Sequence, residues 1–209
     1  MPKTQFLTAG DVDRPTETMS GEPQTGDTVL LERAMAGDEE SLALLYRRRQ
    51  GGVYRFALQM SGRHSVAEEV TQEVFLALIR DAGRYDASRG SVASYLHGIA
   101  RNHVLRRIER DRPYVAIPHE LERDGAQWTA AEDTLGDLTR GEAIESVRQA
   151  VLALPVSFRE VVALCDLHEM SYAEAAVALG CAVGTVRSRL HRARAMLLEK
   201  LKAKKRAFA

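Results

Sequence analysis

The apolar residues of this chain recur at intervals of three and four over most of its length, which is the spacing of amphipathic helices. A first helical segment, 28–113, ends at Pro113, which cannot continue a helix. Within it, Ser65 and Glu68 form a capping box and predict a helix from about Ser65 to Arg80. Because no stretch alternates apolar and polar residues as a strand does, we expect only helices here.

Helical spacing resumes in a second segment, 139–201. Ser171 and Glu174 form another capping box, and Gly180 closes the short helix that follows. After a tight turn a further helix begins. Two short helices joined in this way predict a helix-turn-helix. In the second of these helices one stripe is apolar and is therefore expected to be buried: Val186, Leu190, Ala193 and Leu197.

Three stretches lack this spacing. Residues 1–27 are rich in Thr, Pro, Gly and acids, which predicts a disordered N-terminal tail. Residues 114–138 combine helix breakers with many acids and predict an acidic linker. Residues 202–209 form a basic C-terminal tail. The predicted fold is therefore all-α, with two helical domains joined by a flexible linker.

Composition adds a charge layout to this picture. The chain has 209 residues, is 45% hydrophobic and has a formal net charge of zero. The charges are segregated, however, because the stretch 187–206 is strongly basic and the stretch 114–147 is acidic. The N-terminal residues show no signal-peptide pattern, and no apolar run is long enough to span a bilayer. We therefore expect a soluble cytoplasmic protein without membrane insertion.

The polar side of the last helix suits the major groove of DNA. Arginine can pair with guanine through two hydrogen bonds, and hydroxyl groups can bond bases or phosphates. The alternative is a solvated amphipathic helix, but the capped helix and glycine turn before it favour DNA binding. The candidate DNA-binding residues are Thr185, Arg187, Ser188, Arg189, His191 and Arg192.

A metal site and an enzyme are weaker hypotheses. Cys165 and His168 share a helix face, but Cys181 lies in a turn and His191 two turns further on, so their spacing does not suit zinc. The chain has no phosphate-binding loop, nucleophile elbow or zinc-enzyme motif. We expect no catalytic activity, no metal and no cofactor.

Two helix faces of the first segment also carry candidate chemistry. The helix at 65–80 collects Glu68, Glu69, Gln72 and Glu73 on one face, although most acidic faces are simply solvated. A later helix combines arginines with polar and aromatic residues that can track a phosphate backbone and bind an unstacked base, unless it is only a charged packing helix. Its candidates are Tyr95, His97, Arg101, Asn102, Arg106, Arg107 and Arg110.

Together these stretches resemble the extracytoplasmic-function (ECF), or group IV, RNA polymerase sigma factors of the sigma-70 family. AEEVTQEVFLALIR resembles the helix of region 2 that binds the clamp helices of the beta-prime subunit. SVASYLHGIARNHVLRR resembles the segment that melts and reads the -10 element. LPVSFREVVALCDLHEMSYAEAAVALGCAVGTVRSRLHRAR resembles region 4, which reads the -35 element and touches the beta flap. Residues 28–113 would then be region 2, and residues 139–201 region 4.

The resemblance implies roles for single residues. Glu69, Gln72 and Glu73, supported by Phe75, would bind core polymerase. Tyr95, Asn102, Arg101 and Arg106 would engage the -10 strand, and the polar face of the last helix would contact the -35 element. Tyr95 stands where many relatives have Trp, and Ala182 replaces a frequent Pro. Relatives are typically held inactive by an anti-sigma factor that clamps regions 2 and 4.

Two other functions remain open from the sequence. A stand-alone helix-turn-helix regulator would use its N-terminal helices to dimerise or sense a ligand, and it would bind duplex DNA without polymerase. An interaction adaptor would make no DNA contact through the last helix.

Overall fold

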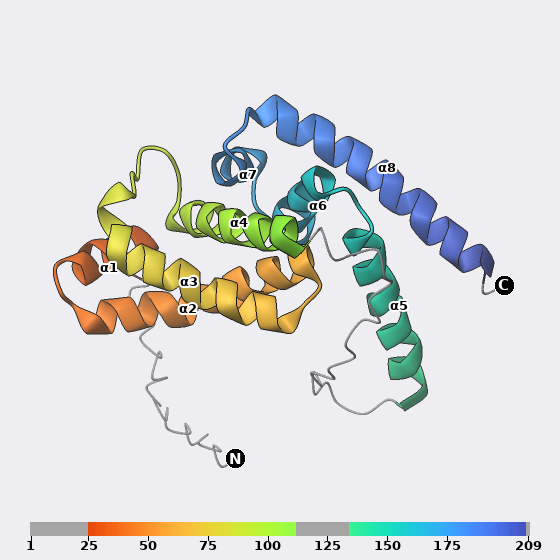
Figure 1. The fold of residues 1–209 in the computed structure, drawn as a ribbon, viewed down its shortest axis with the longest axis horizontal. Helices are drawn as coiled ribbons and strands as arrows, with labels where there is room; N and C mark the ends of the chain where they lie inside the picture. Colours follow the sequence, from red (N-terminus) through yellow and green to blue (C-terminus); the bar gives the residue numbers. More distant parts are fainter. Residues whose placement is uncertain (1–24, 112–133, 208–209) are drawn as a thin grey trace, which may run out of the picture.

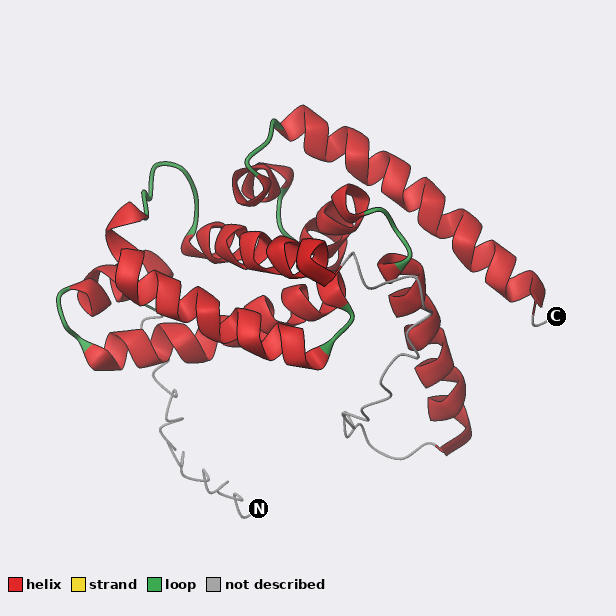
Figure 2. Cartoon of the chain, in the orientation of Figure 1, coloured by secondary structure: helices red, strands yellow, loops and turns green. Residues whose placement is uncertain are grey.

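The computed structural model describes residues 25–111 and 134–207 (Figure 1). The first helical unit, which precedes the gap, contains α1 (Asp27–Met35), α2 (Glu39–Ser61), α3 (His64–Asp81), a 3₁₀ turn, η1 (Ala82–Arg84), and α4 (Val92–Asp111). The second helical unit contains α5 (Thr134–Leu152), α6 (Val156–Val162), a π-helical turn, η3 (Ala163–Leu167), α7 (Tyr172–Leu179) and α8 (Val183–Ala207). None of the described residues forms a strand, so the all-α prediction is confirmed (Figure 2).

The helix predicted at 65–80 is α3, but its capping box is wrong. Since α3 begins at His64, Ser65 lies within its first turn rather than before it. The carbonyl of Arg63 accepts the first bond, from the N–H of Ala67 at 3.1 Å. The serine and glutamate spacing therefore marked this helix start only to within about two residues.

The second capping box is confirmed. The Ser171 hydroxyl accepts from the backbone N–H of Glu174 at 3.2 Å, and the Glu174 carboxylate accepts from the N–H of Ser171 at 3.0 Å. Gly180 ends α7 with φ of 63°, a left-handed conformation that glycine adopts without strain. α8 follows after a short turn, so the predicted helix-turn-helix is present.

The predicted boundaries of the irregular stretches shift. Residues 112–133, which contain most of the predicted linker, lie outside the described residues, as do residues 1–24 of the predicted N-terminal tail. α5 begins at Thr134, inside the stretch predicted as linker. α8 continues to Ala207, through most of the stretch assigned to a basic tail.

The two helical units pack against each other. α4 contacts α2 and α3 on one side and α7 on another, and α2 contacts α5 and α6 (Figure 1). One core cluster joins Phe56 and Leu96 of the first unit to Leu164 and Leu179 of the second. At Gly98 of α4 a Cβ would lie 3.3 Å from the carbonyl oxygen of Ala178, so the missing side chain lets α7 approach closely.

Arg159 of α6 connects the units through backbone carbonyls. Its guanidinium donates to the carbonyl of Met60, near the end of α2, and to those of Leu152 and Leu154, the last at 3.1 Å. These carbonyls belong to residues at or just after the C-terminal ends of α2 and α5, where no intrahelical N–H remains to donate to them. Burial lowers the pKa of Arg159, but a guanidinium stays charged. Within the described ranges, no helix is long and apolar enough to cross a membrane.

Candidate nucleic-acid interface

α8 has one buried face and one open face. Val186, Leu190 and Ala193 are at most 1% exposed, which confirms these members of the predicted apolar stripe, whereas the fourth, Leu197, is half-buried. Their burial against α6 and α7 fixes the rotation of the helix. The side chains of Arg187, Ser188, His191 and Arg192 are exposed, and those of Thr185 and Arg189 are half-buried at the edges of this surface.

One arginine of α8 is used internally. Arg194 binds Asp166 in η3 through two bonds, of 3.1 and 2.5 Å. These hydrogen bonds raise the pKa of Arg194 and hold α8 against the turn that precedes α7. Within the described part of the chain, no ion pair engages Arg187 or Arg192. The exposed face of α8 therefore offers arginines whose donors are available to an anion or a base edge.

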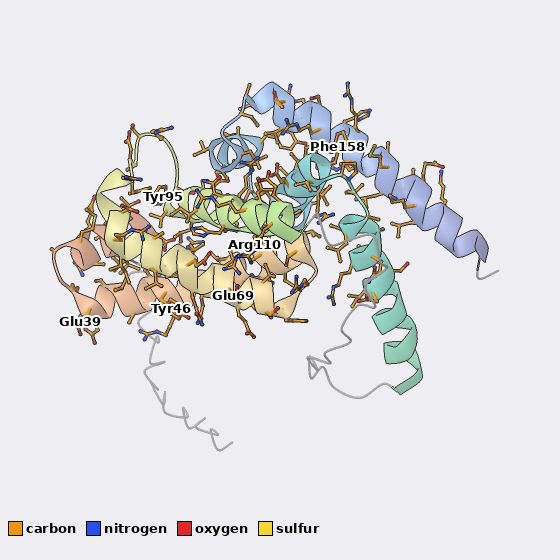
Figure 3. All side chains as sticks on the ribbon, in the orientation of Figure 1. Glu39, Tyr46, Glu69, Tyr95, Arg110 and Phe158 are labelled. Atoms are coloured by element: carbon orange, nitrogen blue, oxygen red, sulfur yellow. The ribbon has the colours of Figure 1, made fainter. Side chains whose placement is uncertain are left out.

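The polar residues of α4 fall into two groups. Asn102 and Arg106 are exposed, whereas Tyr95, labelled in Figure 3, is half-buried. The ring of Tyr95 packs beside that of Tyr85, with ring centroids 5.6 Å apart. Burial raises the pKa of Tyr95, so its hydroxyl stays protonated at neutral pH.

A cavity of about 320 Å³ lies where α4 faces α7. Its walls include Tyr95, Arg101 and Asn102 from α4 and Val177 to Gly180 from the end of α7. The turn before α4 adds Arg84 and Arg89. Aromatic rings and guanidinium groups in one cavity suit a nucleobase and its phosphate.

Arg101 is half-buried beside the polar face of α4, and its guanidinium is occupied within the protein. Its guanidinium binds the carboxylate of Glu160 in α6, with Nε 2.8 Å from Oε1. Glu160 is 1% exposed. The sequence reasoning missed this partner, although a glutamate directly before the apolar run Val161 to Leu164 is the kind of signal that indicates a buried ion pair.

The acidic face predicted on α3 is present. Gln72 is exposed, and the side chains of Glu69 and Glu73 are 51% and 37% exposed. Phe75 is buried, with its ring 4.7 Å from that of Tyr46 in an edge-on contact, so it supports the helix from beneath. Helical spacing places Leu76 and Ile79 in the apolar stripe of this helix, and that placement is wrong: their side chains are 64% and 58% exposed and extend the acidic face toward the end of α3.

Glu69 and Glu73 have basic partners on α4. Arg107 contacts both carboxylates, with its Nη2 2.9 Å from Oε1 of Glu73, and Nδ1 of His103 lies 2.6 Å from Oε2 of Glu73. Partial burial raises the pKa of Glu73, but the bond from Arg107 and the nearby His103 outweigh it and leave that pKa below its usual value. The carboxylate is therefore charged over the whole neutral range.

Of the cysteine and histidine candidates for a metal site, His191 lies on the exposed face of α8, whereas Cys165, His168 and Cys181 lie elsewhere. Cys165 and Cys181 are free thiols, and burial raises the pKa of Cys165. His168 lies against His97 of α4, with ring centroids 5.1 Å apart. In the described ranges no three side chains of His, Cys, Asp or Glu converge as metal ligands.

Comparison with known proteins assigns the family. The model of "Sigma-70 region 2" matches residues 45–113, and that of "Sigma-70, region 4" matches residues 144–197. The ECF RNA polymerase sigma factor SigM of Mycobacterium tuberculosis is 35% identical over 185 residues, which cover 88% of each chain. This chain belongs to the ECF RNA polymerase sigma factors. Members of this family are transcription initiation factors, so the resemblance predicted from the sequence is confirmed.

Two other ECF sigma factors are also similar to this one. SigE of Mycolicibacterium smegmatis is 36% identical over 160 residues, which cover 75% of this chain and 60% of SigE. SigW of Bacillus subtilis is 26% identical over 181 residues, which cover 82% of this chain and 95% of SigW.

Two solved structures share the fold. CnrH, solved with the cytosolic domain of CnrY, superposes with a TM-score of 0.65 at 24% identity, covering 86% of this chain and 99% of CnrH. RpoE of Bartonella quintana, solved with the anti-sigma factor NepR, gives a TM-score of 0.61 at 24% identity, covering 79% of this chain and 97% of that chain.

Proposed function

We propose that this ECF sigma factor binds core RNA polymerase in the cytoplasm and directs it to promoters that carry a -10 and a -35 element, with no catalytic activity of its own. One observation carries the proposal: a single chain presents a helix-turn-helix with an open arginine face, a second polar face on α4 and an acidic face on α3. A stand-alone regulator needs only the first of these surfaces.

Each surface has a separate role in this proposal. Thr185, Arg187, Ser188, Arg189, His191 and Arg192 of α8 contact the -35 element in the major groove. Tyr95, Arg101, Asn102 and Arg106 of α4 engage the -10 strand, where an aromatic ring can stack on an unpaired base. Glu69, Gln72 and Glu73, with Phe75 beneath them, bind the clamp helices of beta-prime, and region 4 also contacts the beta flap.

Promoter binding then requires a rearrangement. α7 covers one side of the cavity that contains Tyr95, and Arg101 is bound to Glu160 of α6. In this proposal, Arg101 becomes available to a DNA strand when its bond to Glu160 breaks, and movement of α7 away from α4 widens access to Tyr95. The exposed face of α8 needs no such movement.

An anti-sigma factor is the proposed regulator. One solved structure of similar fold is the sigma factor RpoE in complex with the anti-sigma factor NepR, and another is CnrH in complex with the cytosolic domain of CnrY. A partner that contacts both units would hold the covered arrangement of α4 and keep core polymerase from α3.

In vitro transcription tests the function. Purified protein and core polymerase should give transcripts that start downstream of shared -10 and -35 motifs, whereas core alone should give none. The Glu73→Lys variant should lose this activity because a cation replaces a docking carboxylate. Tight binding of the isolated protein to palindromic duplex DNA, without promoter-specific transcripts, would instead establish a stand-alone helix-turn-helix regulator.

A further inference from the structure

We propose that Arg107 and His103 of α4 are positioning residues for core polymerase binding, because they hold the carboxylates of Glu69 and Glu73 in one fixed arrangement. This inference rests on the proposed role of those two carboxylates. It adds two residues from the helix assigned to the -10 element to the machinery that docks polymerase.

The geometry of the cluster is specific. Glu69 and Glu73 are four positions apart on α3, so their carboxylates lie one above the other and repel. Arg107 donates one guanidinium nitrogen to each of them, which offsets the repulsion and fixes both side chains. His103, one turn earlier on α4, faces the second oxygen of Glu73. Both oxygens of Glu73 are therefore held from the α4 side.

The exposure of the four groups differs in a way that suits docking. The side chains of Arg107 and His103 are 22% and 23% exposed, whereas those of Glu69 and Glu73 are 51% and 37% exposed. The basic groups are thus covered and the carboxylates remain open. A carboxylate can accept up to about four hydrogen bonds, so each retains room for a donor from another protein.

The cluster is more than an ordinary surface ion pair. An isolated exposed pair contributes little because two flexible side chains lose rotamer freedom to form it. Here one planar guanidinium serves two carboxylates, and the ordering is complete before a partner arrives. Binding by ordered groups costs less entropy than binding by mobile ones. A lysine at position 107 would hold both carboxylates less rigidly, because the donors of an ammonium group lack the planar fork of a guanidinium.

The cluster also links two functional faces of α4. His103 and Arg107 share one face, toward α3, and Asn102 and Arg106 share the next, which is exposed. Each pair is spaced by four residues, so both faces follow the rotation of one rigid helix. Contact with polymerase at Glu69 and Glu73 therefore fixes the helix that presents the proposed -10 residues.

A double-mutant cycle with the full-length protein tests the inference. Core polymerase affinity is measured for wild type, Arg107→Ala, Glu69→Gln/Glu73→Gln and the triple variant, with Arg107→Lys and Arg33→Ala as comparisons. Arg33 is an exposed arginine on α1, outside the proposed surfaces. Thermal unfolding of each variant shows whether the fold is retained.

We expect Arg107→Ala to weaken core binding by about fivefold to tenfold, Arg107→Lys to be intermediate, and Arg33→Ala to match wild type. In the background that lacks both carboxylates, Arg107→Ala should cause no further loss, because nothing remains to be positioned. His103→Ala should weaken binding less than Arg107→Ala, since His103 contacts only the carboxylate of Glu73.

Two outcomes overturn the inference while leaving the sigma function intact: unchanged core affinity of Arg107→Ala, or an equal loss with and without the two carboxylates. If Glu69→Gln/Glu73→Gln binds core as wild type does, the docking face is wrong and the positioning role falls with it. Absence of promoter-specific transcription by wild type would reject the proposed function itself, whatever the cycle gives.

Discussion

Glu160 and Arg101 form an ion pair, but their side chains differ in exposure to solvent. Glu160 is 1% exposed, whereas the side chain of Arg101 is 25% exposed and can reach water by a small movement. A buried charge that loses its partner is strongly destabilising, because the charge cannot be hydrated where it is. The pair therefore predicts an asymmetry between its two single substitutions.

Arg101→Ala should lower the free energy of unfolding by about 3 kcal/mol, since it leaves the Glu160 carboxylate buried without a counter-ion. Glu160→Gln should cost about 1 kcal/mol, because the amide still accepts a hydrogen bond and Arg101 can turn toward solvent. Urea unfolding of both variants measures the difference. Equal losses would mean that Glu160 is hydrated in solution.

Arg192 lies on the open face of α8 and predicts a change in specificity. If it forms a base-edge pair, Arg192→Ala should weaken binding to the -35 element by about 1 to 3 kcal/mol and relax the preference at one base position. Competition between promoter variants for the holoenzyme measures this. An unchanged preference with uniformly weaker binding would assign Arg192 to a phosphate instead.

At the scale of single elements, the start of α7 determines the shape of the helix-turn-helix. Both halves of its capping box are formed, and the hydrogen bonds from Ser171 lower the pKa of Glu174. A smaller contribution comes from Ser91, the residue before α4. The first turn of α7 is thus satisfied by its own cap and contacts the first helical unit.

Ser171→Ala should destabilise the protein by about 1 kcal/mol, because the N–H of Glu174 loses its acceptor. Ser171→Asp restores an acceptor and should recover most of the loss. Thermal unfolding measures both. If Ser171→Ala is neutral while Ser171→Asp is destabilising, the cap contributes nothing to stability.

At the scale of the whole molecule, the packing of the two helical units depends on a cluster that is uncharged at neutral pH. His168 lies 5.1 Å from His97 and 6.2 Å from Phe56 between ring centroids, and its Nε2 is 3.1 Å from the side-chain oxygen of Gln59. Burial, with His97 and Arg55 nearby, lowers the pKa of His168 from 6.5 to about 4. Burial also lowers the pKa of His97, which faces Arg49 and Arg55.

Acid should therefore loosen the packing of the two units. Between about pH 6.5 and pH 4 the unfolded imidazole of His168 binds a proton that the folded one does not, so stability falls as the pH falls through this window. The loss from this residue should be about 3 kcal/mol by pH 4, because each unit of pKa difference is worth about 1.4 kcal/mol. Urea unfolding at several pH values measures it.

His168→Gln supplies the control, because glutamine does not titrate and can still bond Gln59. The stability of this variant should depend less steeply on pH than that of wild type. Titration of His97 should contribute to the pH dependence that remains. An identical slope in both proteins would show that the interface does not depend on this imidazole.

The sequence by itself determined the helices and the buried face of α8, but not the whole buried face of α3, where Leu76 and Ile79 are exposed. Periodicity, the Ser171 capping box and Gly180 are local signals, and local signals suffice for α3, for the helix-turn-helix and for the rotation of α8. The same signals located the open faces of α3 and α8. They failed at Ser65, where the cap lies before the predicted residue.

Only the tertiary structure decided which residues pair with the polar side chains of α4. Arg101 and Arg107 look alike in sequence, yet one binds Glu160 in the second helical unit and the other binds Glu69 and Glu73 in the first. Helical spacing encodes which residues share a face, but the partners of that face are 34 to 59 residues away along the chain and depend on how the helices pack. A sequence read as two domains on a flexible linker therefore gave no sign that α7 would cover part of α4.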